Sequence, residues 1–258
     1  MNAPAIKISK PVREQVSQEE WDVRVNLAAC YRLMAEYGMV EMVANHISAR
    51  VPNTENEFLI NPYGMLYEEM TASSMIKIDI DGNVLFNATD YGINEAGYVI
   101  HSAIHAARHD VDCVIHTHTL AGMSVSAMKC GILPIAQSSL RFLDIAYHDY
   151  EGPALRLDER ERLVQTLGNR EAMVLRNHGL LTVAPSIPEC FNNMFRLERA
   201  CQLQVMALSC NTELRMPPDE VVRYGNEQML PGKRRRMGLL EWPAMLRKLD
   251  RKDPSYAH

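Results

Sequence analysis

The sequence predicts a mixed α/β fold. Two observations carry this prediction: segments with apolar residues at helical spacing interleave with short β-type apolar runs, and the chain shows no internal repeat. Of the 258 residues, 47% are hydrophobic and 23% are charged, as in ordinary globular proteins. A chain of this length can bury a sizeable core without disulfides, as one large domain or two small ones.

Composition excludes several classes of protein. The chain has 27 basic and 32 acidic residues, and the resulting net charge of −5 is unfavourable for a general nucleic-acid binder. No apolar run approaches the roughly 18 residues of a membrane helix, and the N-terminus lacks the apolar segment of a signal peptide. The six cysteines form no CxxC pair, which favours reduced, buried thiols. We therefore expect a cytoplasmic protein without nucleic-acid or membrane partners.

The N-terminal half is expected to contain a long helix followed by strands. Residues 1–16, interrupted by two prolines, are interpreted as a flexible lead-in. Ser17 and Glu20 match a capping box, and apolar residues at helical spacing follow as far as Gly38, where the helix should end. The strands expected next are 57–61, 76–80 and 84–86, and the Asp81-Gly82 turn joins the last two.

The C-terminal half should add further helices and strands. The helices expected are 96–108, 119–129 and 187–210, and the strands are 111–118, 172–176 and 180–184. Pro217-Pro218 marks a boundary, so we divide the chain into a main domain at 17–215 and a C-terminal tail at 216–258. The tail carries a basic run at 233–236, interpreted as a solvated face, and a short helix near 239–249.

The sharpest chemical signal is the tripeptide His116-Thr117-His118 at the end of an expected strand. Residues i and i+2 of a strand point to the same face, so both imidazoles can reach one ion at zinc–nitrogen distances of about 2.0–2.1 Å. Two solvent-facing or hydrogen-bonded histidines would show the same pattern. His178, in the turn between two apolar strands, could complete a three-histidine site or be an ordinary turn residue.

Glu95 and two polar turns could belong to the same site. Glu95 begins the helix that leads back to the His116 strand, where a carboxylate could be a fourth ligand or an acid/base group. A carboxylate at the start of a helix is also stabilised by the macrodipole alone. The turns that contain Asn45 and Gly64 could line a pocket.

Other residues carry weaker signals. Tyr147 and His148 could donate a proton to a leaving oxygen or be purely structural. His101, His105 and His109 repeat at every fourth position of one helix. That spacing can bind zinc, but without an HExxH motif we interpret these three histidines as a polar helix face.

Taken together, these residues resemble the class II aldolase and adducin family over about residues 20–210. The resemblance is closest to adducin head domains, and the runs that carry it are FLINPYGMLYEEMTASS at 58–74, VSAMKCGILPI at 125–135 and AYHDYEG at 146–152. It implies an α/β/α sandwich with a central, mainly antiparallel sheet. It also implies a homotetramer, because the active sites of this family lie between neighbouring subunits.

The resemblance further implies roles for individual residues. The metal ligands would be His116, His118 and His178, and the acid/base carboxylate would be Glu95, where adducin heads, which are not enzymes, have glutamine. Zinc is the expected metal, with manganese, iron, cobalt or nickel as alternatives. Tyr147 is a second catalytic candidate. The substrate-binding candidates are Asn45, Gly64, Asn94 and His148.

Departures from the family pattern bear on the substrate. The sugar-phosphate aldolases hold phosphate with a G-N-x-S loop and a Ser-Ser-Glu segment. The matching stretches here, Asn45-His46-Ile47-Ser48 and Ile93-Asn94-Glu95, lack the glycine and both hydroxyls. Because phosphate is bound by clustered N–H and O–H donors, we expect a substrate without phosphate.

The expected function is therefore a divalent-metal-dependent lyase, of the aldolase or decarboxylase type, that acts through an enediolate on a small hydroxy- or keto-acid. The alternative is a non-catalytic adducin-like scaffold associated with actin. The long adducin-like segments favour the scaffold. Glu95, the three histidines and the lack of a long lysine-rich extension weigh against it.

Overall fold

The central sheet confirms the mixed α/β class. The computed structural model describes residues 10–152 and 159–258. Within them, eight strands form one sheet in the order β4-β3-β2-β1-β5-β8-β7-β6, in which only the pair β6–β7 is parallel. The strands are β1 (His46–Arg50), β2 (Glu57–Ile60), β3 (Ile76–Asp79), β4 (Val84–Phe86), β5 (Cys113–Thr117), β6 (Ala146–His148), β7 (Ala172–Leu175) and β8 (Gly179–Ala184).

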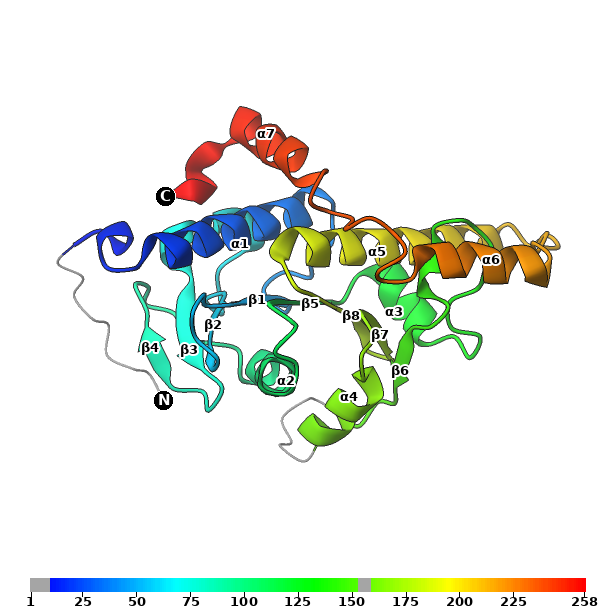
Figure 1. Cartoon of the computed structure of the whole chain (residues 1–258), viewed down its shortest axis with the longest axis horizontal. Helices are drawn as coiled ribbons and strands as arrows, with labels where there is room; N and C mark the ends of the chain where they lie inside the picture. Colours follow the sequence, from blue (N-terminus) through cyan, green and yellow to red (C-terminus); the bar gives the residue numbers. More distant parts are fainter. Residues whose placement is uncertain (1–9, 153–158) are drawn as a thin grey trace.

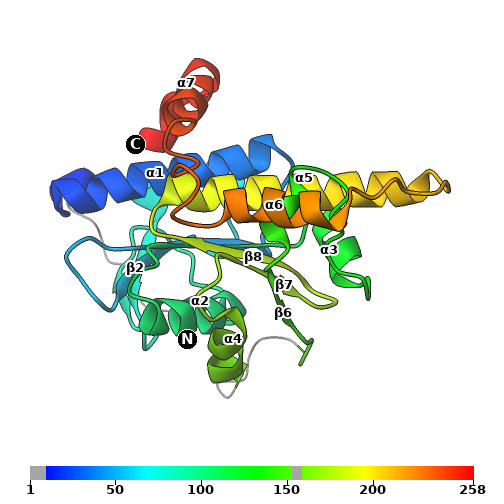
Figure 2. The ribbon, with the colours of Figure 1, turned by 45° about the vertical axis from the view of Figure 1, so that its right-hand side comes forward.

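Helices cover both faces of the sheet, which confirms the α/β/α sandwich (Figures 1 and 2). One face carries α1 (Gln18–Glu36), α5 (Ile187–Ser209) and the short α3 (Leu120–Ser126). The opposite face carries α2 (Glu95–Ala107) and α4 (Glu159–Leu167). The sheet therefore separates two apolar layers.

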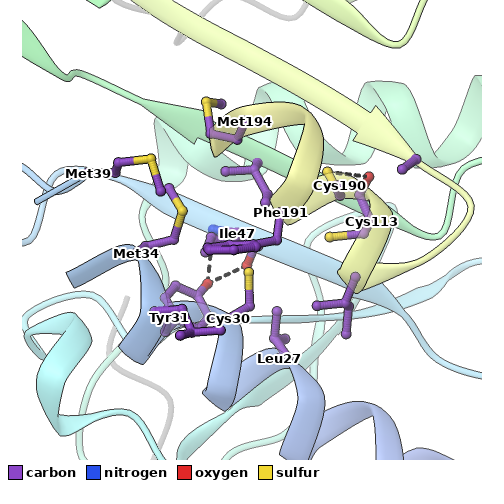
Figure 3. Close-up of a cluster of buried hydrophobic side chains, with 14 of the residues drawn as sticks. Leu27, Cys30, Tyr31, Met34, Met39, Ile47, Cys113, Cys190, Phe191 and Met194 are labelled. Carbon is purple, nitrogen blue, oxygen red and sulfur yellow. Dashed lines mark hydrogen bonds between the residues drawn. The ribbon is translucent and has the colours of Figure 1, made fainter. Parts of the chain in front are cut away.

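The larger layer lies between the sheet and the helices α1 and α5. Leu27 of α1 and Phe191 of α5 pack with Ile47 of β1, and all three side chains are buried (Figure 3). Burying each such side chain contributes about 1.5–3 kcal/mol. The Tyr31 hydroxyl accepts a hydrogen bond from the Ile47 N–H at 2.9 Å and donates one to the Ile47 carbonyl. These contacts fix the position of α1 relative to β1.

Four cysteines in this layer are buried free thiols, as the sequence predicts. They are Cys30, Cys113, Cys190 and Cys201, whereas Cys130 and Cys210 are exposed. Burial raises the pKa of the Cys30 and Cys113 thiols, which keeps them protonated and unreactive.

The smaller layer positions the candidate site. Ile100 and Ile104 of α2 and Leu163 of α4 pack against Val114 of β5 and Leu181 of β8. Because side chains alternate along a strand, His116 points to the same face of the sheet as Val114. The first histidine of the tripeptide thus faces α2 and α4.

The C-terminal tail packs against the main body. It contains α6 (Asp219–Met229), which the sequence analysis missed, and α7 (Trp242–Lys252), close to the expected short helix. Trp242 is buried against α5, and its indole N–H donates to Asn26 of α1 at 2.6 Å. The apolar residues of α6 recur at helical spacing, but none of its residues is buried.

Three residues of the basic run, Lys233, Arg235 and Arg236, are exposed as expected, whereas the Arg234 side chain is only 8% exposed. Arg234 pairs with Glu171 before β7, Arg235 with Glu241, and Arg236 with Glu189 of α5. Arg234 departs from the interpretation made from sequence, because its partner Glu171 lies 63 residues away along the chain. The arginines hold the tail against the body of the protein.

The N-terminal segment is described only in part. Residues 1–9 of the expected flexible lead-in lie outside the described residues, while Val12–Glu14 form a 3-10 turn with Val12 buried. Ser17 caps α1 as predicted, since its hydroxyl accepts from the Glu20 N–H at 3.1 Å. No helix in the described part of the chain is long and apolar enough to cross a bilayer.

Candidate metal centre

Sheet topology brings His116, His118 and His178 together. β5 ends at Thr117, so His118 follows it directly. β8 runs antiparallel beside β5, with Leu180 opposite Thr117. The β7–β8 turn, which contains His178, must therefore lie next to the end of β5. One ring nitrogen from each of the three histidines lies within 4.8 Å of those of the other two.

The turn sequence Asn177-His178-Gly179 is dictated by this close approach. Asn177 has a φ of 54°, in the left-handed region that asparagine tolerates better than most residues. A Cβ at Gly179 would stand 2.2 Å from the carbonyl oxygen of Thr117. Only glycine lets β8 begin so close to β5, and this closeness delivers His178 to the other two rings.

Hydrogen bonds fix the orientation of two of the rings. The Nδ1–H of His116 donates to the Leu180 carbonyl at 3.0 Å, and the Nδ1–H of His118 donates to the Glu41 carboxylate at 2.7 Å. In a neutral imidazole with a protonated Nδ1, the Nε2 atom carries a lone pair. The two Nε2 atoms are 2.8 Å apart. Two lone pairs at that distance repel unless a proton or a cation stands between them, so this donor set fits a divalent metal.

Electrostatics favour neutral ligands. Burial, together with the nearby imidazoles of His46 and His178, lowers the pKa of His116 well below its usual range. Burial, and then His118, lowers the pKa of His178 to about 4. Neutral imidazoles are the form that binds Zn²⁺, Mn²⁺, Fe²⁺, Co²⁺ or Ni²⁺, so protons would compete little for these two residues at neutral pH.

Glu41 is a site residue that the sequence analysis missed. It lies in the loop between α1 and β1, and 77 residues separate it from His118. A carboxylate that accepts from the second nitrogen of a ligating histidine is the usual support of a metal site. The only sequence signal was its place four residues before Asn45, in a loop already suspected of lining a pocket.

A chain of buried polar side chains leads away from His116. His46 lies opposite His116 on β1, with the ring centroids 5.0 Å apart. His46 Nδ1 is 2.8 Å from His101 Nε2, and the Ser48 hydroxyl lies 2.6 Å from His101 Nδ1 and 2.7 Å from His105 Nε2. We call these four residues the histidine chain.

The histidine chain corrects the interpretation of α2. His101 and His105 are fully buried, not part of a polar helix face, and only His109 is exposed. His46 and Ser48 of β1 face them and bond both ring nitrogens of His101 and the Nε2 of His105, while His105 Nδ1 has no partner within the described residues. Sequence spacing within α2 contains no sign of these partners, which lie more than 50 residues away.

The start of α2 packs closely against this chain. A Cβ at Gly97 would stand 2.6 Å from the His46 ring, so the helix backbone rests on the imidazole. Asn94 precedes the helix, and its side-chain oxygen accepts from the Gly97 N–H at 3.4 Å. Glu95, the first helical residue, is exposed and makes no hydrogen bond or ion pair within the described residues. It does not belong to the group of three histidines.

Tyr147 and His148 point to opposite faces of β6. The Tyr147 hydroxyl accepts from the Ile132 N–H at 2.9 Å, and Arg176 covers its ring. His148 is buried and lines the same recess as His178, with Glu159 Oε1 3.6 Å from its Nε2. Of the two residues, His148 is the one beside the metal centre.

The remaining candidates lie in loops. Asn45 is buried; its Oδ1 accepts from the Glu41 N–H at 2.8 Å, while its Nδ2 has no partner among the described residues. Gly64 has a φ of 115° and packs against the Tyr91 ring, next to the Tyr63–Gly92 bridge. Gly64 thus joins two loops, and Asn45 offers an unused donor.

Comparison with known proteins identifies the family. Residues 25–205 match the family profile "Class II Aldolase and Adducin N-terminal domain". This chain belongs to the class II aldolase and adducin family. A crystal structure of an aldolase II superfamily protein from Pseudomonas syringae is 48% identical, with a TM-score of 0.90 over 96% of this chain and all of that one. A Caulobacter vibrioides protein, provisionally classed as a class 2 aldolase, is 50% identical over 95% of this chain and 96% of its own length.

Both branches of the family are similar to this chain. Alpha-adducin of Mus musculus is 44% identical over 72% of this chain, but the match spans only 26% of adducin. L-Fuculose 1-phosphate aldolase of Glaciozyma antarctica shares the fold, with a TM-score of 0.80 at 24% identity over 97% of this chain and 96% of that one. The family assignment confirms the resemblance seen in the sequence, including its similarity to adducins.

Proposed function

We propose that this protein is a divalent-metal-dependent lyase of the aldolase or decarboxylase type. The observation that carries the proposal is the group formed by His116, His118 and His178. In His116 and His118, the Nδ1–H already donates a hydrogen bond to an acceptor within the protein. The metal, when bound, supplies a Lewis acid that stabilises negative charge developing on a substrate oxygen. Zinc is the proposed metal, with manganese, iron, cobalt or nickel as alternatives.

The chain's own residues would bind the substrate and move the proton. Glu95, at the start of the helix that rests on His46, is proposed as the acid/base group. Asn45 Nδ2 is a buried donor without a partner, suited to a substrate oxygen. His148 lines the recess beside His178 and would orient the rest of the substrate. His148 is the stronger candidate for contacting the substrate, because Tyr147 points to the other face of β6, away from the recess beside His178.

The proposed substrate is a small hydroxy- or keto-acid without phosphate. A carboxylate needs fewer donors than a phosphate dianion and can bind the metal directly. The loop that contains Asn45 supports this choice. Asn45 occupies the position of the glycine in the phosphate-binding loop, and its Oδ1 already accepts a hydrogen bond from the Glu41 N–H. The test is a screen of the metal-loaded protein against sugar phosphates and against hydroxy- and keto-acids. Turnover of a sugar phosphate alone would contradict the substrate class.

The second candidate function is an adducin-like scaffold. The 44% identity to alpha-adducin favours it. Cosedimentation with filamentous actin tests this candidate, with serum albumin as the negative control. A scaffold would pellet with actin in a saturable manner and show no turnover in the acid screen. The lyase proposal predicts turnover and no saturable pelleting.

A further inference from the structure

Glu41 lies at the junction of the candidate metal centre and the candidate substrate loop. We propose that Glu41 is a positioning residue that fixes His118 for metal binding and couples this ligand to the loop that carries Asn45. The inference rests on the proposed metal site and adds to it a residue outside the ligand set.

The backbone around Glu41 is held at several points. α1 ends at Glu36 and is followed by Gly38, which has a φ of 67°; the chain then turns so that the Ala44 N–H donates to the Glu41 carbonyl at 2.9 Å. Asn45 Oδ1 accepts from the Glu41 N–H at 2.8 Å. Both backbone polar groups of Glu41 are therefore bonded within a five-residue loop, which fixes the point from which its side chain reaches His118.

The loop contains backbone strain that needs a reason. Met42 has a φ of 45°, although it is neither glycine nor asparagine, and its side chain is 77% exposed. A conformation of this kind costs on the order of 1–3 kcal/mol and persists where surrounding contacts require it. Packing of Met42 does not provide that requirement, since the side chain lies mostly in solvent. The hydrogen bonds of Glu41 and Asn45 in the same loop are the contacts that require this conformation of Met42.

The Glu41–His118 contact is directional and is more than an exposed ion pair. Exposed ion pairs contribute little because two mobile side chains must be ordered. Here the carboxylate meets Nδ1 at 2.7 Å, and the opposite nitrogen of the same ring lies in the three-histidine group. Holding Nδ1–H sets both the tautomer and the ring direction, so Nε2 presents a lone pair to the metal.

The same residue links the metal ligand to the substrate loop. The side-chain oxygen of Asn45 accepts from the Glu41 N–H, and its buried Nδ2 has no partner in the part of the chain that the structure describes. A substrate oxygen bound at Nδ2 would tighten the loop that positions the Glu41 carboxylate. Binding at Asn45 and binding at His118 are thus coupled through one residue.

The test is metal affinity, measured by chelator competition with Zn²⁺, and the visible spectrum of the Co²⁺-loaded protein. Glu41→Ala should weaken binding by about 10–100-fold and alter the Co²⁺ spectrum, which is the usual effect of losing such a support. Glu41→Gln keeps an acceptor for Nδ1–H and should recover most of that loss. Asn45→Ala should weaken metal binding by a smaller factor, because it frees only the Glu41 backbone.

The matched control is Glu213→Ala, which removes an exposed carboxylate beyond the end of α5 and should leave affinity and spectrum unchanged. Wild-type affinity and spectrum in Glu41→Ala would overturn the inference while leaving the metal site intact. Equal losses in Glu41→Gln and Glu41→Ala would also overturn it, since charge rather than positioning would then matter. A wild-type protein that binds neither ion would instead overturn the proposed function.

Discussion

At the scale of a single residue, Glu95 distinguishes the two proposed functions, a lyase and a non-catalytic scaffold. Glutamine is nearly isosteric with glutamate but cannot take up a proton at neutral pH. Glu95→Gln should therefore leave the fold and the bound metal intact and lower turnover by about 10²–10⁴-fold, the usual contribution of an acid/base group. Steady-state kinetics and metal analysis of the same preparation check this. If the Glu95→Gln variant keeps both its activity and its metal, Glu95 has no role in the mechanism.

Gly179 is the residue whose small size brings the histidines together. In Gly179→Ala, the new methyl group would meet the Thr117 carbonyl at 2.2 Å, so β8 must shift away from β5. We expect a loss of about 1–3 kcal/mol in the free energy of unfolding, together with weaker metal binding because His178 moves with the strand. Urea denaturation and chelator competition measure the two effects.

The matched control for this prediction is Gly92→Ala. Gly92 has open space around its Cα and no positive φ, so the added methyl group should change neither quantity appreciably. Equal stability of the two variants would show that the close approach of β8 to β5 does not constrain residue 179.

At the residue scale, local signals in the sequence indicated which histidines lie close together. The spacing of His116 and His118 and the turn around His178 were visible in the chain, and the structure groups these three side chains. Glu41 was missed because its partner is 77 residues away and a loop has no periodicity. Contacts of this kind depend on the sheet order, which single-sequence patterns do not contain.

At the scale of elements, the histidine chain joins α2 to β1 and makes stability depend on pH. Burial, followed by the charge of Arg50, lowers the pKa of His105 to about 3. The unfolded chain protonates this residue near pH 6.5, so it binds more protons than the folded protein below that pH. The stability is fully present above pH 6.5 and falls as pH decreases towards 3, by up to about 1.4 kcal/mol per pH unit for this group.

Urea unfolding at pH 7, 6 and 5 measures this dependence. His105→Gln keeps a polar side chain that cannot titrate, so its stability should fall less steeply than that of the wild type. His109→Gln, which alters the exposed histidine of the same segment, should retain the wild-type slope. Identical slopes for all three proteins would contradict a buried, neutral His105.

Long helices with a clear start signal were predicted well, and strands without an apolar run were not. α1 begins after the Ser17 cap and α5 has Pro188 in its first turn, and both helices matched the expected ranges closely. β1 was missed because His46 and Ser48 interrupt its apolar pattern, and β6 because its sequence Ala146-Tyr147-His148 contains no apolar run. In both strands the polar residues face partners within the fold. From the sequence alone, such residues are interpreted as exposed.

At the scale of the whole molecule, the surface beside the metal centre suggests assembly. Leu120 is 82% exposed two residues after His118, and Met42 is 77% exposed beside Glu41. Where exposed apolar side chains form a contiguous patch, they mark an interaction surface. We propose that a second copy of this chain covers them and that the assembly is a homotetramer.

Light scattering should give a tetramer for the wild type. Leu120→Asp places a charge in the proposed interface and should produce a smaller species, whereas Leu203→Asp, on the exposed side of α5, serves as the comparison. A wild-type monomer at micromolar concentration would contradict the proposed assembly.

Metal content tests the central claim most directly, because the lyase proposal depends on the group formed by His116, His118 and His178. Elemental analysis after dialysis against Zn²⁺ and removal of excess metal should give about one ion per wild-type chain. The folded double variant His116→Ala/His178→Ala should retain almost none. A double variant with the full wild-type metal content, or a wild-type protein with none, would contradict the account.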